Sequence, residues 1–196
     1  MVTGTEKLSQ PLVAVFSGPP ATGKSTLADA IGRELPAPVF AWDWLVAALT
    51  PFEPVQRALK AMSRDAYHDV GYSLMTQLVE KQLRSGQSAL LDCVARERAR
   101  SRWAQTAAAH DATMRVIECV CSDVDVHRSR VDGRVRAIPG WDELDWEHVE
   151  HVRSIYEPLE CEKLVVDAVE PIAENLARVR RHLGLSDDSE EQREER

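Results

Sequence analysis

Eight consecutive residues near the N-terminus have the types and spacing that phosphate binding requires. Residues 18–25 read GPPATGKS, which matches G-x-x-x-x-G-K-[ST] in full. Gly18 and Gly23 allow backbone conformations that a side chain would block, so successive N–H groups and the following helix N-terminus can surround phosphate oxygens. Lys24 would contact the β- and γ-phosphates, and the Ser25 hydroxyl would bind Mg²⁺.

The motif therefore predicts a site for a nucleoside triphosphate, ATP with Mg²⁺. An apolar run precedes it and an amphipathic segment follows it, as the strand–loop–helix context of such loops requires. The nucleotide-binding residues predicted from the loop are Gly18, Pro19, Pro20, Ala21, Thr22, Gly23, Lys24, Ser25 and Thr26.

Asp43 is the second candidate, because it follows the short apolar run 39–42. We expect it at the end of a second strand, which lies next to the first strand in many such folds. A carboxylate there could accept the proton of a substrate hydroxyl as its oxygen attacks the γ-phosphate. The alternative is that Asp43 only caps a helix starting at Trp44. A cap alone does not explain Trp42 and Trp44, which we assign to substrate binding.

Asp92 follows the apolar run 89–91 and is a candidate second ligand for Mg²⁺, with Ser25. An acid at the end of a buried strand is typical of sites that hold Mg²⁺ or its water ligands. The alternative is an ion pair with Arg96 or Arg98, which follow closely.

Four arginines occur within nine residues, at positions 128, 130, 134 and 136. Arg130 and Arg134 have the spacing that places two side chains on one helix face, and Arg128 with Arg134 is the other possible pair. Planar guanidinium groups suit both stacking on a base and phosphate contact. A solvated basic helix end is the alternative interpretation. Arg128 and Arg130 are predicted to bind nucleotide, and Arg130 and Arg134 to act with Lys24 and Asp43 in catalysis.

Residues 133–144 form a predicted loop, because Gly133, Pro139 and Gly140 interrupt the helical pattern. Trp141 and Arg136 in this loop are candidate substrate contacts. The loop could close over a substrate, or it could be a packed surface loop.

Strand and helix patterns alternate through the chain. This order predicts an α/β three-layer sandwich with a five-stranded, mostly parallel sheet and ligands at the carboxyl ends of the strands. We expect one domain over residues 1–185, a lid at about 125–150 and a disordered acidic tail at 186–196. The expected strands are 12–16, 39–42, 89–92, 114–120 and 164–167, and the expected helices are 26–35, 44–49, 55–85 in one or two pieces, 97–110, 124–132, 145–156 and 171–183.

The composition narrows the class of partner. The net charge is −8, and the tail contributes −4 through six acids and two arginines, so the chain lacks the basic balance of a general nucleic-acid binder. No apolar run approaches the ~20 residues that span a bilayer, and the N-terminus has no signal pattern. We expect a cytoplasmic protein without membrane contact, with Cys93, Cys119 and Cys121 as buried free thiols.

The phosphate loop together with residues 39–49 resembles chloramphenicol phosphotransferase, the kinase domain of polynucleotide kinase and other small P-loop kinases such as gluconate kinase. The resemblance is sharp over residues 12–51 and implies that Asp43 is the base for the acceptor hydroxyl. Residues 127–136 resemble the lid of nucleoside monophosphate and shikimate kinases, which implies one arginine on adenine and another on the moving phosphoryl. Residues 167–171 would line the adenine pocket or form a plain turn.

The main hypothesis is an ATP- and Mg²⁺-dependent phosphotransferase acting on a hydroxyl of a small molecule. One alternative is a polynucleotide 5′-hydroxyl kinase or a nucleotide kinase, which needs a basic groove. Another is a nucleotide-binding regulatory module with little turnover. The sequence names neither the acceptor nor the oligomeric state.

Overall fold

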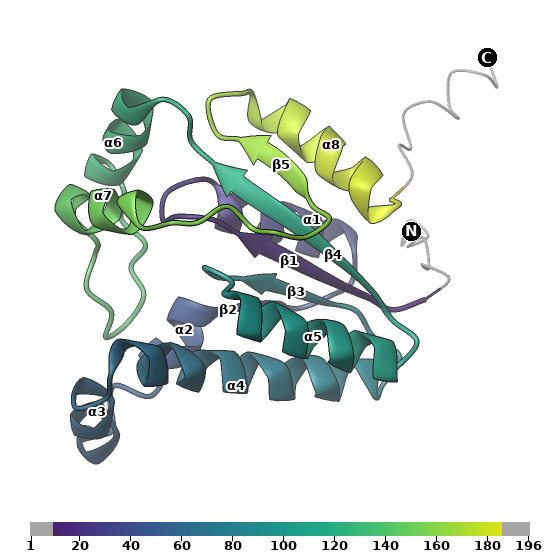
Figure 1. Ribbon diagram of the computed structural model, residues 1–196, viewed down its shortest axis with the longest axis horizontal. Coiled ribbons are helices and arrows are strands. Elements are labelled where there is room, and N and C mark those ends of the chain that lie inside the picture. Colours follow the sequence, from purple (N-terminus) through teal and green to yellow (C-terminus); the bar gives the residue numbers. More distant parts are fainter. Residues whose placement is uncertain (1–9, 186–196) are drawn as a thin grey trace, which may run out of the picture.

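The computed structural model describes residues 10–185, which contain a five-stranded sheet with the order β2-β3-β1-β4-β5. All four strand pairings are parallel, which confirms the predicted architecture. The carboxyl ends of the strands face α6 and α7 (Figure 1). The strands are β1 (Leu12–Ser17), β2 (Val39–Ala41), β3 (Ala89–Asp92), β4 (Thr113–Val120) and β5 (Leu164–Asp167).

Helices cover both faces of the sheet (Figure 1). One face packs against α1 (Lys24–Glu34) and α8 (Ile172–Leu183), and the other against α4 (Arg64–Leu83) and α5 (Glu97–Ala109). The remaining helices lie near the carboxyl end of the sheet or lead into α4, and are α2 (Trp42–Ala47), α3 (Glu53–Lys60), α6 (Val124–Asp132) and α7 (Trp146–Ser154).

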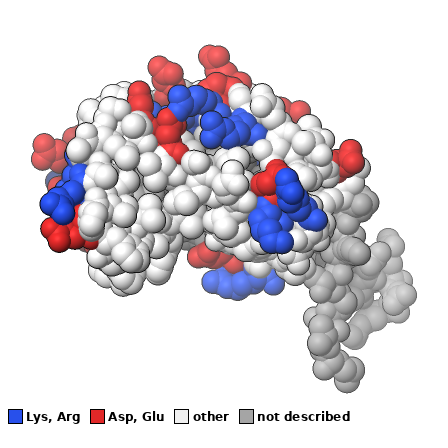
Figure 2. Space-filling model, turned by 90° about the horizontal axis from the view of Figure 1, so that it is seen from below, with Lys and Arg blue, Asp and Glu red and all other residues white. Residues whose placement is uncertain are grey.

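Charged side chains surround the face on which α4 lies without forming one continuous basic area. Figure 2 shows this face from below, with Lys and Arg lying next to Asp and Glu around a largely uncharged centre. Ion pairs within single helices, Arg57–Glu53 in α3 and Arg84–Glu80 in α4, are of this kind.

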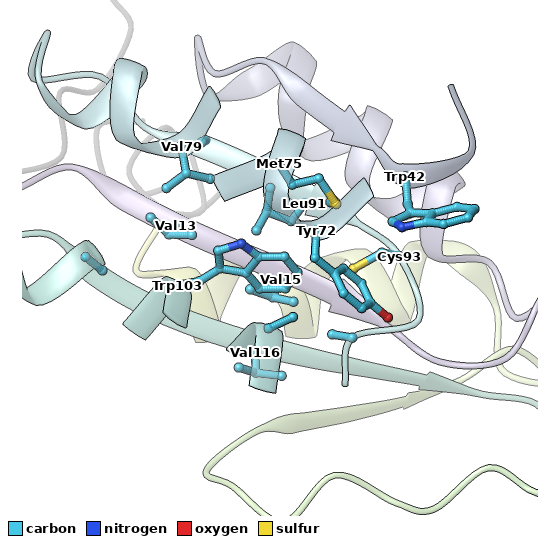
Figure 3. Close-up of a cluster of buried hydrophobic side chains, with 14 of the residues drawn as sticks. Val13, Val15, Trp42, Tyr72, Met75, Val79, Leu91, Cys93, Trp103 and Val116 are labelled. Atoms are coloured by element: carbon cyan, nitrogen blue, oxygen red, sulfur yellow. The ribbon is translucent and has the colours of Figure 1, made fainter. Parts of the chain in front are cut away.

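The core forms because β1 is buried on both sides, as its continuous apolar sequence predicts. Side chains alternate along a strand, so Val13 and Val15 join the α4/α5 cluster while Ala14 and Phe16 join the α1/α8 cluster. Trp103 of α5 lies over the first of these clusters, beside Val15 and Val116 (Figure 3). Its indole N–H is satisfied by the hydroxyl of Thr76 at 3.0 Å.

Two local predictions around the second strand are wrong. The strand ends at Ala41, so Trp42 and Asp43 already belong to the first turn of α2. Moreover, β2 pairs with β3 and not with β1. The reason is burial: β3 is fully buried and takes the interior position, whereas the three residues of β2 are only partly buried and form an edge.

Other local predictions are confirmed. The helical stretch 55–85 is divided into α3 and α4, and Ser63 caps α4 by accepting a hydrogen bond from the Ala66 N–H at 3.3 Å. The thiols of Cys93, Cys119 and Cys121 are free and buried.

None of the helices formed by residues 10–185 is long and apolar enough to cross a membrane. The predicted tail 186–196 lies outside the described residues.

Candidate active site

The phosphate loop connects β1 to α1 through a backbone that requires its glycines. Gly18 and Gly23 have φ values of 143° and 86°, and Ala21 has a φ of 61°. A Cβ on Gly18 would lie 2.0 Å from the carbonyl oxygen of Cys119, so β4 leaves no room for a side chain there. Thr22 Oγ1 and Lys24 Nζ both donate to the Pro19 carbonyl, at 2.8 and 2.7 Å. These bonds hold the loop in a compact turn at the start of α1.

Lys24 and Asp92 lie buried together behind this loop. Burial lowers the pKa of Lys24, and the negative charge of Asp92 partly opposes that shift. Burial likewise raises the pKa of Asp92, which accepts a hydrogen bond from Ser25 Oγ at 2.6 Å. The alternative ion pairs for Asp92 are wrong, since Arg96 binds Asp65 and Arg98 binds Asp69.

The Ser25 hydroxyl and the Asp92 carboxylate fit a divalent cation. Both are oxygen donors, which Mg²⁺ prefers, and a buried carboxylate with a raised pKa gains stability from a nearby positive charge. Within residues 10–185 no group of three or more His, Cys, Asp or Glu side chains could hold a metal alone. Mg²⁺ commonly binds through one or two protein carboxylates together with substrate phosphates and water.

Asp43 lies in the first turn of α2, where the helix dipole favours an acid. It does not cap the helix, because the N-cap is Ala41 and no side-chain cap bond forms there. The Asp43 carboxylate instead forms an ion pair with Arg136 of the segment between α6 and α7. The Asp43 side chain keeps 35% of its surface exposed and borders the main cavity.

The arginines of the predicted lid occupy three different places. Because α6 ends at Asp132, Arg134 lies beyond the helix, and the predicted common face with Arg130 is wrong. Arg134 borders the cavity with Lys24 and Asp92, and burial lowers its pKa.

Arg130 and Arg128 are not among the residues that line this cavity. Arg130 donates to the carbonyl of Ala168, in the loop after β5, at 2.5 Å. Arg128 lies over the Trp146 ring, 6.0 Å from its centroid. The loop 167–171 thus contacts a lid arginine, while the Arg128 side chain is largely exposed.

Residues 133–145 pack against α2 and are named here the lid loop. Glu143 accepts from the backbone N–H groups of Arg136 and Ala137, at 2.7 and 3.1 Å, and lies 3.6 Å from Arg136 Nε. Gly140 fits against Thr50, where a Cβ would lie 2.5 Å from the Thr50 hydroxyl. The lid loop is therefore a packed segment in this structure.

A cavity of about 2010 Å³ joins these groups. Lys24, Ser25, Asp92 and Arg134 line one part of it, and we call them the donor side. The other part, the acceptor side, is lined by Asp43 and by aromatic side chains of α2, α4 and the lid loop, which are Trp42, Trp44, Tyr67, His68, Tyr72 and Trp141.

The predicted tryptophan contacts differ in what they offer a ligand. Trp42 is 7% exposed and Trp44 is 53% exposed. Trp141 packs on the edge of Trp42 with ring centroids 5.8 Å apart. Of the three indoles, that of Trp44 is by far the most open.

Sequence reasoning missed four structural contributors. His127 of α6 is buried, and its Nε2 lies 2.8 Å from the Pro20 carbonyl, which connects the lid to the phosphate loop. Tyr67 and His68 line the acceptor side; burial and the charge of Arg96 lower the pKa of His68 to about 4.

Glu118 is the fourth, and it could have been found, because it interrupts the apolar run 116–120. It is buried in β4 and accepts from Tyr156 Oη at 2.8 Å and from the Leu159 N–H at 3.0 Å. Lys163 forms an ion pair with it at 2.8 Å. These contacts anchor the segment that follows α7.

The fold and the phosphate loop together define a P-loop protein of the small-kinase type. A family model described as an AAA domain matches residues 13–159. Because the match spans more than half of the chain, the protein belongs to this AAA domain family of P-loop proteins. No curated protein matches the chain in sequence.

Solved kinase structures share this fold. A proposed kinase from Chloroflexus aurantiacus is 24% identical with a TM-score of 0.65, covering 89% of this chain and 100% of its own. A gluconokinase from Sinorhizobium meliloti is 18% identical with a TM-score of 0.61, covering 89% and 96%. The Mycobacterium tuberculosis APS kinase CysC, in complex with AMPPNP and APS, is 17% identical with a TM-score of 0.61, covering 89% and 98%. At these identities the likeness establishes the P-loop kinase fold.

Proposed function

We propose that this protein is an ATP- and Mg²⁺-dependent phosphotransferase that moves the γ-phosphate of ATP to a hydroxyl of a small molecule. The observation that carries the proposal is the shared cavity. Its donor side contains the groups expected to bind triphosphate, and its acceptor side contains Asp43 beside aromatic side chains. A site that only stored nucleotide would not need a carboxylate and a large additional space next to the phosphates.

On the donor side, the phosphate-loop amides and Lys24 would bind the triphosphate, and Ser25 with Asp92 would hold Mg²⁺. The metal would neutralise charge on the phosphates. Arg134 borders the same space and would stabilise charge on the phosphoryl group during transfer. Arg130, which is bound to the Ala168 carbonyl in the loop after β5, would contact the nucleoside end.

On the acceptor side, Asp43 would accept the proton of the attacking hydroxyl. Its present partner is Arg136, so an acceptor must take up a position beside that ion pair or displace it. Closure of the lid loop over a bound acceptor would exclude water, which would otherwise compete with the acceptor.

The charges around the cavity favour a small molecule over a nucleic-acid end. Binding a phosphate backbone requires unneutralised cationic groups. Three arginines that line the cavity, Arg96, Arg100 and Arg136, each pair with a carboxylate. The face in Figure 2 likewise shows no continuous basic area.

A screen for ATP consumption tests the proposal. Purified protein with Mg²⁺ and ATP would be supplied with hydroxyl-bearing antibiotics, sugars, nucleosides and nucleic-acid ends. We expect at least one small-molecule class to stimulate ADP release and to gain a phosphate detectable by mass spectrometry. Asp43→Asn should lower that transfer by roughly 100-fold or more, while ATP affinity changes by less than about threefold.

Two outcomes would redirect the assignment. Stimulation by nucleic-acid ends with a steep salt dependence would favour a polynucleotide kinase. If no acceptor is phosphorylated and Asp43→Ala leaves both residual ATP turnover and the cellular phenotype intact, the kinase proposal fails in favour of a nucleotide-binding regulatory module.

A further inference from the structure

The Trp42 indole is held against α4 by a hydrogen bond and by ring contacts. Its indole N–H donates to the carbonyl of His68 at 3.2 Å. Its ring contacts Tyr67 edge-on, with centroids 5.3 Å apart. In Figure 3 it lies at the same end of the buried cluster as Tyr72 and Cys93. The side chain is thus fixed to α4 by packing and by a hydrogen bond.

Gly71 of α4 creates the space for this indole. A Cβ at position 71 would lie 2.0 Å from Trp42 Nε1, 2.5 Å from Cδ1 and 2.6 Å from Cε2. Glycine inside a helix costs about 1 kcal/mol relative to alanine, and Gly71 has an ordinary backbone conformation without a positive φ. The glycine is therefore explained by the approach of Trp42 and by nothing in the helix itself.

The position of Trp42 determines the position of Asp43. Trp42 is the first residue of α2, which has only six residues, and Asp43 is the second. Three of its six residues are buried, Trp42, Val46 and Ala47, and Trp42 is the one that lies in the first turn. The indole seated against α4 therefore fixes the first turn, from which the Asp43 carboxylate reaches the cavity.

The same indole also contacts the lid loop. Trp141 packs on its edge, and Arg136 of that loop pairs with Asp43. The lid loop therefore contacts both members of the dipeptide at the start of α2, one through an aromatic ring and the other through a charge.

We propose that Trp42, seated against Gly71, is a positioning residue that orients Asp43 toward the acceptor and sets the resting position of the lid loop. Trp42 is then not a substrate contact, and Trp44, with more than half of its surface exposed, is the indole that faces ligand. This inference rests on the proposed function, because it assigns Asp43 the role of base.

Gly71→Ala tests the inference, because it adds one methyl group where the indole lies while favouring the helix by local propensity. Ser73→Ala is the matched control, an exposed position on the same helix. The full-length variants would be assayed with Mg²⁺ and ATP, with water as the acceptor and with any acceptor found in the screen. We expect Gly71→Ala to lower turnover by about tenfold or more with ATP affinity unchanged, as for an interaction made only in the transition state. Ser73→Ala should match the natural protein.

The decisive comparison is made in an Asp43→Asn background. If Gly71→Ala acts through Asp43, it should cause no further loss once that carboxylate is gone. A general structural defect would lower turnover by the same factor in both backgrounds, and this would overturn the inference. So would turnover within about twofold of the natural protein for Gly71→Ala.

If Gly71→Ala does not fold, Trp42→Phe replaces it in the same pair of backgrounds, because it removes the N–H that binds the His68 carbonyl. The criteria are unchanged. A loss of turnover seen only when Asp43 is present supports the inference. An equal loss of turnover in the natural and Asp43→Asn backgrounds, or no loss in either, overturns it. An Asp43→Asn variant with full turnover would instead refute the proposed function, and the positioning role with it.

Discussion

The donor side and the acceptor side of the cavity are built in different ways. On the donor side, Lys24 and Ser25 come from one contiguous loop, residues 18–25, and are joined by Asp92 from β3 and Arg134 from the lid loop. The acceptor side is assembled from α2, α4 and the lid loop, which are separated by tens of residues in the chain. The difference shows that one part of a site can be specified by local sequence while its neighbour depends on tertiary packing.

The largest effect is expected on the donor side, from Lys24→Met. This change keeps an unbranched side chain of nearly the same length and removes its charge, so turnover should fall roughly 100- to 1000-fold. Since burial already disfavours the charged form of Lys24, the variant should be at least as stable as the natural protein. ADP release and thermal denaturation measure the two quantities. Unchanged turnover would mean that the loop does not act as the donor site.

Arg134→Gln and Arg130→Gln test whether the two lid arginines have different roles. Arg134 borders the phosphate end of the cavity, so its loss should lower kcat by about 10- to 100-fold. Arg130 lies beside the loop after β5, so its loss should raise the KM for ATP by about three- to tenfold. Arg128→Gln is the control, because the Arg128 side chain is largely exposed and is not among the residues that line the cavity. Exchanged phenotypes for the two variants would reverse the assignment.

Glu118→Gln tests an anchor outside both sides of the cavity. Burial alone would raise the pKa of Glu118, but the bonds from Lys163, Leu159 and Tyr156 together lower it. The stabilisation is therefore complete above the unfolded pKa of about 4.3 and is lost as the pH falls through the lower folded value.

The variant should lose about 2 kcal/mol at pH 7, because one charged member of a buried network is replaced. Its free energy of unfolding should also depend less on pH below about 4.5 than that of the natural protein. Urea denaturation at several pH values measures both. Identical pH profiles for the two proteins would show that Glu118 is not the group responsible.

The smallest effect is expected from Trp44→Ala. If this exposed ring contacts the acceptor, the KM for the acceptor should rise by about fivefold, with ATP binding and stability unchanged. Steady-state kinetics with the acceptor found in the screen measures this change. A KM equal to that of the natural protein would leave the acceptor side without an exposed indole contact.

The sequence predicted the donor side better than the acceptor side. The phosphate loop, the parallel sheet and the Ser25–Asp92 proximity followed from a local motif and from where apolar runs end. The neighbour of β2 could not be predicted, because pattern alone does not say which buried strand lies beside an edge strand. The predicted common helix face of Arg130 and Arg134 was wrong, because α6 ends at Asp132, before the chain reaches Arg134.

Two of the aromatic side chains that line the acceptor side were also not predicted. Tyr67 and His68 precede the apolar stripe of α4 in sequence, and only the approach of α2 to that helix gives them a role. The role of Gly71 could not be predicted either. A glycine within a helix indicates a close contact only once the neighbouring atoms that fill the space beside it are known.

The bonds of Glu118 and His127 have a consequence for how this enzyme scaffold could vary. His127 ties the beginning of the lid to the phosphate loop, and Glu118 ties the chain that leaves it to the sheet. Length changes between these two points, within the lid loop, would leave both attachments intact. Insertions or deletions at residues 156–163 would not. Related chains that have acquired new acceptors should therefore differ in the length of the lid loop and share the length of the segment after α7.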